Sequence, residues 1–441
     1  MNDTTPCRID APPMDQFNYA LQALGDQSMH MVIAFDGLLD ERRLREATVT
    51  VLTAVPVLGS RFVECDAPYW ERLPEIDRET LVCIHISTDP LRDLPGVLAI
   101  PVDPAAGPQI RLHILRTKSS DTLCITVHHA VMDAHGLLTC TRFLAECYQR
   151  NPACKIHLKA DRTDRSLLAV LAQFPDTLPP RDQPVPEYPP VGWAFPTRPS
   201  ECHTSDFTIR TLPASRLVAV KRVGKLLGAT VNDVLLAAYF RALCTTIGPA
   251  KGCPVPVMVS IDLRRYLNTS QTAALKSTIC NQSVAFVVMM TPDTQSRDGM
   301  IISTRDTMLA HKAHTPGIAS AVDLETLGYY GFFRICERVQ MMKATYAACH
   351  ANPPFLGNIG IIPEEVVAFS KDLTVTNAFV AGIVIDPPGV ALGVTTFRDR
   401  LTLIIGYGKP AIPHAAMEQF IDTLVSYLPG AEGTARKDGP D

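Results

Sequence analysis

Short apolar runs alternate with amphipathic stretches along the first 150 residues, and this pattern predicts strands that alternate with helices. The run MHMVIAFDG predicts a strand at residues 29–37. Residues 41–54 carry apolar side chains on one helical face, and Asp40 before them is a suitable N-cap. Such an alternation is typical of an α/β fold. Further strands are predicted at CIHIS, QIRLHIL and LCITV, and an amphipathic helix is predicted after Gly136.

The alternation begins again in the second half of the chain. A strand predicted at SDFTIRTL is followed by a helix that should end at Gly228, since glycine tolerates the left-handed backbone that closes many helices. Thr230 is the expected N-cap of the next helix. The other predicted elements are strands at VPVMVSIDLR and SVAFVVMM, a long helical region at residues 303–350, a hairpin that turns at Arg398-Asp399, and a last helix at residues 414–428.

Nine prolines fall within residues 175–199, between the two alternating halves. Proline lacks an N–H and favours extended backbone, so this stretch predicts a linker between subdomains, with Trp193 as its anchor. We therefore expect the chain to be divided into an N-terminal subdomain at residues 1–173, a linker at residues 174–200, a C-terminal subdomain at residues 201–428 and a disordered tail at residues 429–441.

The composition excludes several classes of protein. The 441 residues are 46% apolar and 20% charged, which is ordinary for a soluble globular protein. The net charge is −4 and no basic stripe is present, so binding to nucleic acid is not expected. The longest apolar runs are less than half the length that crosses a bilayer, and the first residues lack the features of a secretory signal. These features predict a cytoplasmic protein without a transmembrane segment.

The cysteines do not form a pattern that suggests disulfides or a structural metal. There are 13 of them, an odd number, and none belongs to a Cys-x-x-Cys pair. A disulfide scaffold would be evenly paired and a zinc ribbon would have clustered pairs. Buried free thiols in a reducing compartment are therefore expected.

A dense group of polar side chains follows the predicted strand LCITV. The segment TVHHAVMDAHG contains His128, His129, Asp133, His135 and Gly136. A metal site is disfavoured, because adjacent side chains on a strand point to opposite faces and the spacing matches no common metal motif. A polar cluster satisfied inside the core and an acid–base site both remain open. Ligand sites collect at strand ends in α/β folds, and imidazole exchanges protons near neutral pH.

The pattern His128-His129-x-x-x-Asp133-x-x-Gly136 resembles the HHxxxDxxG signature of the chloramphenicol-acetyltransferase-like superfamily. That group includes peptide-synthetase condensation domains, BAHD acyltransferases, wax ester synthases and alcohol acetyltransferases. Other segments resemble the family in the same order, from about residue 11 to residue 425. They are FDGLLDERRLREATVTVLTAVPVLGSRF with Arg61 near its end, GATVNDVLLAAYFRAL, VSIDLRRYL followed by ICNQSVAF, and FLGNIGIIP.

The chain also departs from this family. Cys280 stands where glycine is usual, and Gly357 replaces the serine of the alcohol acetyltransferase branch. The DFGWG segment of plant BAHD enzymes is missing, and no adenylation or carrier domain adjoins. The resemblance therefore implies a stand-alone enzyme and leaves the acceptor open.

The resemblance implies an α/β fold of two chloramphenicol-acetyltransferase-like subdomains, arranged as a V-shaped pseudo-dimer with a channel at their interface. It also implies that His129 is the general base, which removes a proton from an acceptor hydroxyl or amine as that group attacks a thioester. Asp133 would then shape the loop by pairing with an arginine. Arg264 is the first choice of partner and Arg61 the second.

The remaining motif residues would support this base. His128 is expected to pack or hydrogen-bond behind the loop, and Gly136 to leave room beside the base at a helix N-terminus. His135 is expected to face either solvent or the channel. Asn281 and Asn358 are candidate channel residues or ordinary turn asparagines.

We therefore predict a stand-alone acyltransferase with no permanently bound cofactor and no metal. Its co-substrate would be an acyl-CoA or a phosphopantetheine thioester. One alternative is a condensation-type enzyme that works with an acyl or peptidyl carrier protein, which would need a basic docking patch near one channel mouth. Another is a non-catalytic relative that binds an acyl ligand or a partner. Acyl length, acceptor, ester or amide product and oligomeric state are not predicted.

Overall fold

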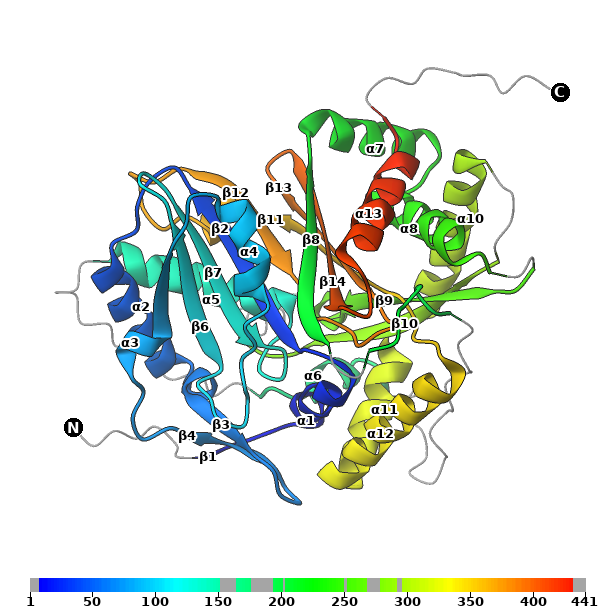
Figure 1. Ribbon diagram of the computed structural model, residues 1–441. Coiled ribbons are helices and arrows are strands. Elements are labelled where there is room, and N and C mark those ends of the chain that lie inside the picture. Colours follow the sequence, from blue (N-terminus) through cyan, green and yellow to red (C-terminus); the bar gives the residue numbers. More distant parts are fainter. Residues whose placement is uncertain are drawn as a thin grey trace.

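The computed structural model describes most of the chain, and the described parts form two lobes that lie side by side (Figure 1). Trp193 is buried in the core of the second lobe, consistent with its expected role as an anchor. Most of the predicted linker at residues 174–200 and nearly all of the predicted tail at residues 429–441 lie outside the described residues. The structure describes residues 8–150, 164–175, 193–200, 203–249, 252–267, 278–291 and 296–430.

The first lobe is built on a five-stranded sheet in the order β12-β2-β7-β6-β5. Neighbouring strands are antiparallel except for β5 and β6, which are parallel. The predicted strands of the first half are confirmed. The strands of this sheet are β2 (Ser28–Phe35), β5 (Val82–Ile86), β6 (Ile110–Arg116), β7 (Asp121–His128) and β12 (Val375–Ala381).

Helices cover both faces of this sheet. Alternate residues of the strands pack against α2 (Glu41–Ala54) and α5 (Ala134–Gln149) on one face, and the other residues pack against α4 (Pro90–Leu98). Asp40 caps α2 as predicted, since its Oδ1 accepts from the Arg43 N–H at 2.9 Å. A small sheet at the edge of this lobe contains β1 (Arg8–Asp10), β3 (Ser60–Val63) and β4 (Tyr69–Arg72), and the short helix α3 (Arg78–Leu81) packs beside α2. The short helix α6 (Leu168–Leu171) instead packs against residues 263–266 of the second lobe.

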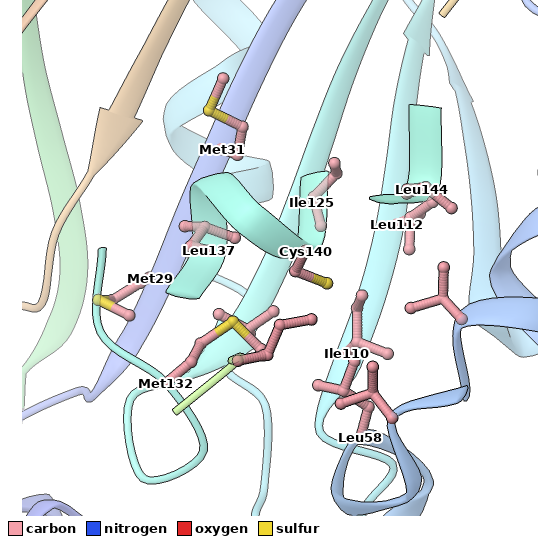
Figure 2. Packing of buried hydrophobic residues seen from close by; sticks show 14 of the residues in the cluster. Met29, Met31, Leu58, Ile110, Leu112, Ile125, Met132, Leu137, Cys140 and Leu144 are labelled. Atoms are coloured by element: carbon pink, nitrogen blue, oxygen red, sulfur yellow. The ribbon is translucent and has the colours of Figure 1, made fainter. Parts of the chain in front are cut away.

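The loop between β7 and α5 is anchored in the apolar core of the first lobe. Figure 2 shows Met132, from this loop, in the same apolar layer as Leu137 and Cys140 of α5. Met132 is fully buried, as are Ala130 and Val131 beside it. The apolar residues of the histidine segment therefore anchor the loop in the core.

The second lobe contains a six-stranded sheet in the order β10-β9-β11-β13-β14-β8. Its central pairs β9–β11 and β11–β13 are parallel, and the others are antiparallel. The predicted hairpin is confirmed, because β13 and β14 join at Arg398, whose φ is +53°. The strands are β8 (Thr204–Leu212), β9 (Val255–Asp262), β10 (Ser283–Met290), β11 (Phe355–Ile362), β13 (Ala391–Phe397) and β14 (Arg400–Lys409).

The helices of the second lobe begin and end largely as the sequence predicts. Thr230 and Asp233 form a capping box, in which each side chain accepts from the other residue's backbone N–H. Gly228, with φ +65°, follows the preceding helix. The helices that pack on this sheet are α7 (Ala214–Leu226), α8 (Val231–Ile247), α10 (Arg297–Ala313) and α13 (His414–Tyr427).

The long helical region predicted at residues 303–350 is helical in the structure, but it is divided into separate helices. The structure has three helices there, α10, α11 (Ile318–Tyr329) and α12 (Phe332–Cys349). The breaks fall at Gly317 and Gly331, whose φ values of +88° and +89° are incompatible with a continuous right-handed helix. Helices α11 and α12 pack with α1 (Pro13–Ala20), which is followed by the 3₁₀ turn η1 (Leu21–Leu24). In Figure 1, α11 and α12 lie below β9 and β10 of the second lobe.

One strand crosses from the second half of the chain into the first lobe. Strand β12 falls within residues 201–428, expected for the second subdomain, yet it pairs with β2 at the edge of the first sheet. Val366, Val367 and Phe369, just before it, pack into the core of the first lobe. Strand β12 covers the edge of β2 that would otherwise be exposed. The first lobe is therefore completed by a segment from the second half of the chain.

The ten cysteines that the structure describes are all free thiols, and Cys253 and Cys349 are exposed. Among the described residues, no single helix has both the length and the apolar composition needed to cross a membrane. The pair α7 and α8 passes that test only when taken together, and it is bent by 102°.

Candidate active site

The histidine segment forms the exit of β7 and the entrance of α5. Strand alternation separates the two adjacent histidines, as expected. The backbone N–H of His129 donates to Gln27 O at 2.8 Å, which holds the loop against the start of β2. The ring of His128 turns inward, where its Nδ1 accepts from the Ala130 N–H at 3.1 Å. The ring of His129 lines a cavity between the lobes.

Asn281 orients the ring of His129 from the second lobe. The side-chain N–H groups of Asn281 donate to the carbonyl oxygens of His129 and Ala130, both at 2.9 Å. These two bonds fix the amide so that its oxygen faces His129 Nδ1 at 3.2 Å. Because that oxygen only accepts, Nδ1 must carry the proton. The lone pair of the neutral ring is therefore on Nε2.

Burial keeps both histidines neutral. It lowers the pKa of His129, although the backbone of His129, Asp133 and Asn281 oppose that shift. Burial also lowers the pKa of His128, to about 3, and the neighbouring His129 adds to this shift. At neutral pH His129 is thus an unprotonated imidazole, and His128 is a neutral hydrogen-bond acceptor.

Asp133 joins the loop to the second lobe through Arg264. The Arg264 Nη1 donates to Asp133 Oδ2 at 2.8 Å, and the two side chains are only 2% and 1% exposed. Arg264 Nη2 also donates to the carbonyl of Cys280 at 3.0 Å. Arg61, the second-choice partner, instead pairs with Glu71 on the surface. Of the two arginines, the structure places Arg264 against Asp133.

Both carboxylate oxygens of Asp133 are fully used. Oδ1 accepts from the Gly136 N–H at 2.8 Å and caps α5. Oδ2 also accepts from the Gln282 N–H at 2.8 Å and the Ser283 hydroxyl at 3.0 Å. Burial alone raises the pKa of Asp133, but the charge and hydrogen bonds of Arg264 and the backbone N–H groups outweigh it and hold the pKa at about 2. Asp133 is therefore a permanently charged residue that connects the two lobes.

A second buried ion pair, not identified from the sequence, braces the same loop. Arg165 contacts Asp15 with Nε at 3.0 Å and Nη2 at 2.9 Å, and Nη2 also donates to Val131 O at 2.7 Å. Asp15 also accepts from the Trp70 indole N–H at 3.0 Å. Neither Asp15 nor Arg165 belongs to a recognisable motif, and they lie 150 positions apart in sequence. Only the folded chain brings them together.

Gly136 allows the second lobe to approach α5 closely. A Cβ at this position would lie 2.8 Å from Met132 Cβ and 3.1 Å from the carbonyl oxygen of Cys280. The backbone N–H of Gly136 already donates to Asp133, so this N–H is not available to bind an anion. Room for Met132 and for the backbone of Cys280, rather than a left-handed backbone, requires glycine here.

Alanine in place of Gly136 is expected to destabilise the fold by about 1–3 kcal/mol, because the new methyl overpacks the contact with Cys280. The matched control is Gly96→Ala in α4, where no atom lies within 4 Å of the added Cβ. That change should be neutral or stabilising by about 0.5–1 kcal/mol, since alanine is the better helix former. Urea unfolding of both variants tests this, and equal midpoints would contradict it.

Three other predicted residues lie away from the cavity wall. His135 is partly exposed, with Nδ1 3.6 Å from Asp262 Oδ2 on the second lobe. Asn358 donates to Asn232 Oδ1 at 3.1 Å and holds the start of α8 against β11. Asn281 is fully buried behind His129. His135, Asn281 and Asn358, which were candidate channel residues, are all outside the lining of this cavity.

The cavity lies at the interface of the lobes and has a volume of about 590 Å³. Its walls come from α1 and η1, from β9 and β10, from α11 and α12, and from residues 383–385. Most of the lining side chains are apolar, and His129 is the histidine among them. A space of this size accommodates a drug-sized molecule. Within the described part of the chain, no group of three or more His, Cys, Asp or Glu side chains is arranged to hold a metal ion.

No family model matches the sequence, and no curated protein matches it. Solved structures do share its fold. Trichothecene 15-O-acetyltransferase from Fusarium sporotrichioides is 12% identical, with a TM-score of 0.69 over 98% of each chain. The first condensation domain of the CDA synthetase is 15% identical, with a TM-score of 0.62 over 98% of this chain and 99% of that domain. Polyketide synthase associated protein 5 from Mycobacterium tuberculosis is 15% identical, with a TM-score of 0.63 over 93% of this chain and 95% of that one.

The chain therefore has the two-lobed, chloramphenicol-acetyltransferase-like fold of condensation domains and of this acetyltransferase. The fold predicted from the HHxxxDxxG pattern is confirmed over nearly the whole chain.

Proposed function

We propose that the protein is an acyltransferase that moves an acyl group from a thioester to a hydroxyl or amine acceptor, with His129 as general base. The observation that carries the proposal is the placement of His129. Its ring lines the inter-lobe cavity, and Asn281 holds Nδ1 so that Nε2 keeps its lone pair. A neutral imidazole beside a space that admits substrate is what general-base catalysis requires.

The transfer follows from this arrangement. Nε2 of His129 takes the proton of the acceptor as its oxygen or nitrogen attacks the thioester carbonyl. The tetrahedral intermediate then collapses, the C–S bond breaks, and the protonated ring returns the proton to the departing thiolate. The products are an ester or amide and a free thiol, and no acyl-enzyme intermediate is needed.

Asp133 and Arg264 position the base without touching substrate. Their ion pair fixes the loop to the segment that carries Cys280, and the next residue, Asn281, is the one that orients His129. A shift between the lobes would therefore move Asn281 relative to the ring. Positioning within a fraction of an ångström matters for proton transfer, so this tie supports the proposed role.

The donor can be an acyl-CoA or an acylated carrier protein. Trichothecene 15-O-acetyltransferase and the condensation domain of the CDA synthetase share the fold, so both kinds of donor remain under this proposal. A carrier protein would need a basic surface at the cavity mouth. Among the described residues that line the cavity, Arg338 is the one with a permanent positive charge.

The test is thiol release by the wild-type protein. Acetyl-CoA and octanoyl-CoA are each incubated with a primary alcohol or a primary amine, and free thiol is measured with the ester or amide product. We expect thiol release that depends on the acceptor and matches product formation. If no donor is consumed with any acceptor while an acyl ligand still binds, the non-catalytic alternative is correct instead.

A further inference from the structure

Gln27 lies directly opposite His129, where β2 begins and β7 ends. The antiparallel register pairs Ser28 with His128, and the 2.8 Å bond from the His129 N–H to Gln27 O extends this pairing by one residue. Directly opposed residues of an antiparallel pair place their side chains on the same face, with Cβ atoms about 4.5–5.5 Å apart. Gln27 and His129 both line the inter-lobe cavity, so their side chains are neighbours in its wall.

The amide of Gln27 has an unused acceptor. Its Nε2 donates to the carbonyl oxygens of Leu21 and Gly25, both at 3.3 Å, and these bonds fix the orientation of the amide. The Oε1 has no hydrogen-bond partner among the described residues, although Gln27 is only 3% exposed. A buried acceptor without a donor is unfavourable. Oε1 is therefore the atom of this amide that is left for a ligand with a donor.

The cavity thus presents two neighbouring acceptors to the group that reacts. One is Nε2 of His129, because the proton of that ring is on Nδ1, facing Asn281. The other is Oε1 of Gln27. A hydroxyl has a single proton, so it can donate to His129 or to Gln27 but not to both. A neutral primary amine has two N–H groups and can donate to both while its lone pair attacks the thioester.

We propose that Gln27 selects a neutral primary amine as the acyl acceptor, so that the product is an amide and not an ester. One N–H donates to Nε2 of His129, which takes this proton as the C–N bond forms and passes it to the departing thiolate when the C–S bond breaks. The other N–H donates to Oε1 of Gln27 and remains on the nitrogen of the amide. The inference rests on the proposed acyl transfer and narrows its acceptor.

Three neutral probes of similar shape test this selection. para-Butylaniline has two N–H groups, N-methyl-para-butylaniline has one N–H, and para-butylphenol has one O–H. For each probe kcat/KM is measured with octanoyl-CoA, in wild type and in Gln27→Met, which removes Oε1. Because the probes differ in intrinsic reactivity, the quantity compared is the change in their ratios between the two proteins. The aniline-to-phenol ratio should fall about tenfold in Gln27→Met, as expected for the loss of one buried hydrogen bond. The ratio of N-methylaniline to phenol should not change.

Two further variants separate the acceptor oxygen from effects on the fold. Gln27→Glu loses the same Nε2 bonds as Gln27→Met but keeps an acceptor oxygen, so it should retain the wild-type ratio. The matched control is Gln109→Met, which should also retain it. Gln109 is a fully buried glutamine outside the cavity lining, and its Oε1 is unpaired too. Its Nε2 donates to the carbonyls of Ser60 and Pro104 at 2.8 and 3.0 Å. Melting temperatures show that each variant folds.

Binding without a thioester separates this inference from the proposed acyl transfer. The affinity of each probe is measured from its shift of thermal unfolding, and Gln27→Met should bind para-butylaniline about tenfold more weakly than wild type, with no such loss for the phenol. If this loss is seen but wild type consumes no thioester with any acceptor, the selection of the amine stands and acyl transfer is wrong. If thioester is consumed but the aniline-to-phenol ratio is unchanged in Gln27→Met, or falls equally in Gln27→Glu, the inference is overturned. Equal affinity of wild type and Gln27→Met for the aniline overturns it as well.

Discussion

Alanine in place of His129 is expected to lower the rate of acceptor-dependent thiol release by about 10²–10⁴-fold. The change removes Nε2, the ring nitrogen left unprotonated when Asn281 accepts from Nδ1. The described lining of the cavity holds no second imidazole that could take the proton. Because the walls stay in place, KM for the acceptor should change far less than kcat.

The control for this variant is His135→Ala. His135 belongs to the same loop region, but its ring lies beside Asp262 outside the cavity lining. That variant should retain close to the wild-type rate. If His129→Ala kept the wild-type rate as well, His129 could not be the general base.

The pH dependence provides a second readout of the same role. A general base works in its unprotonated form, and burial lowers the pKa of His129 below the ordinary 6.5 of histidine. The wild-type kcat/KM should therefore be level around neutral pH and fall only on the acid side, below pH 6.5. The residual rate of His129→Ala should lack this acid limb. An acid limb centred above pH 6.5 in wild type would contradict the assignment.

Methionine in place of Arg264 is expected to lower the free energy of unfolding by about 3–5 kcal/mol. The change leaves the carboxylate of Asp133, which is 1% exposed, without its counter-charge. It also leaves the carbonyl of Cys280 without the Nη2 donor. Since the loop would lose one of its ties to the second lobe, activity should fall even at temperatures where the variant is folded.

Arg61→Met is the matched control. Arg61 is half exposed and pairs with Glu71, with the Nη2–Oε2 distance at 2.6 Å. An exposed ion pair contributes roughly 0–1 kcal/mol, so this variant should unfold close to wild type. Chemical denaturation of both variants compares them directly. Equal losses in the two would mean that the Asp133–Arg264 pair does not tie the lobes together.

The pH dependence of stability distinguishes the ion pair from simple packing loss. In wild type the pKa of Asp133 is held at about 2, below its ordinary 3.8, so the pair stabilises the fold above about pH 4. That contribution is lost as the pH falls toward 2. In Arg264→Met the carboxylate loses the charge and hydrogen bond of the arginine, so the pKa of Asp133 should rise above its wild-type value. The deficit of the variant relative to wild type should therefore shrink as the pH is lowered. A deficit that is constant with pH would point to packing alone.

Local patterns predicted the elements well because they depend on neighbours in sequence. Asp40 and Thr230 cap the helices they were expected to cap, and the last hairpin turns at Arg398. The helical region at residues 303–350 was predicted without its breaks, which fall at Gly317 and Gly331. The apolar pattern shows that the region is helical, but it does not show that the chain changes direction at these glycines.

The candidate site was predicted unevenly. The resemblance to the HHxxxDxxG family singled out His129, which the structure places on the cavity wall. It also favoured Arg264 as the partner of Asp133, and the structure pairs these two residues. Asn281 was considered as a channel residue, whereas it is buried and orients the ring of His129. Asp15 and Arg165 had no signal at all, because an ion pair between residues 150 positions apart leaves no local pattern.

The sequence by itself determined the alternation of strands and helices, the caps, and a loop that carries one imidazole away from the core. These follow from the periods of strand and helix and from short-range hydrogen bonds. Only the tertiary structure decided that β12 joins the first sheet, that Asn281 sets the tautomer of His129, and that segments from both halves of the chain line one cavity. Each of these depends on how the two lobes pack, and side chains brought together across an interface are neighbours in space alone.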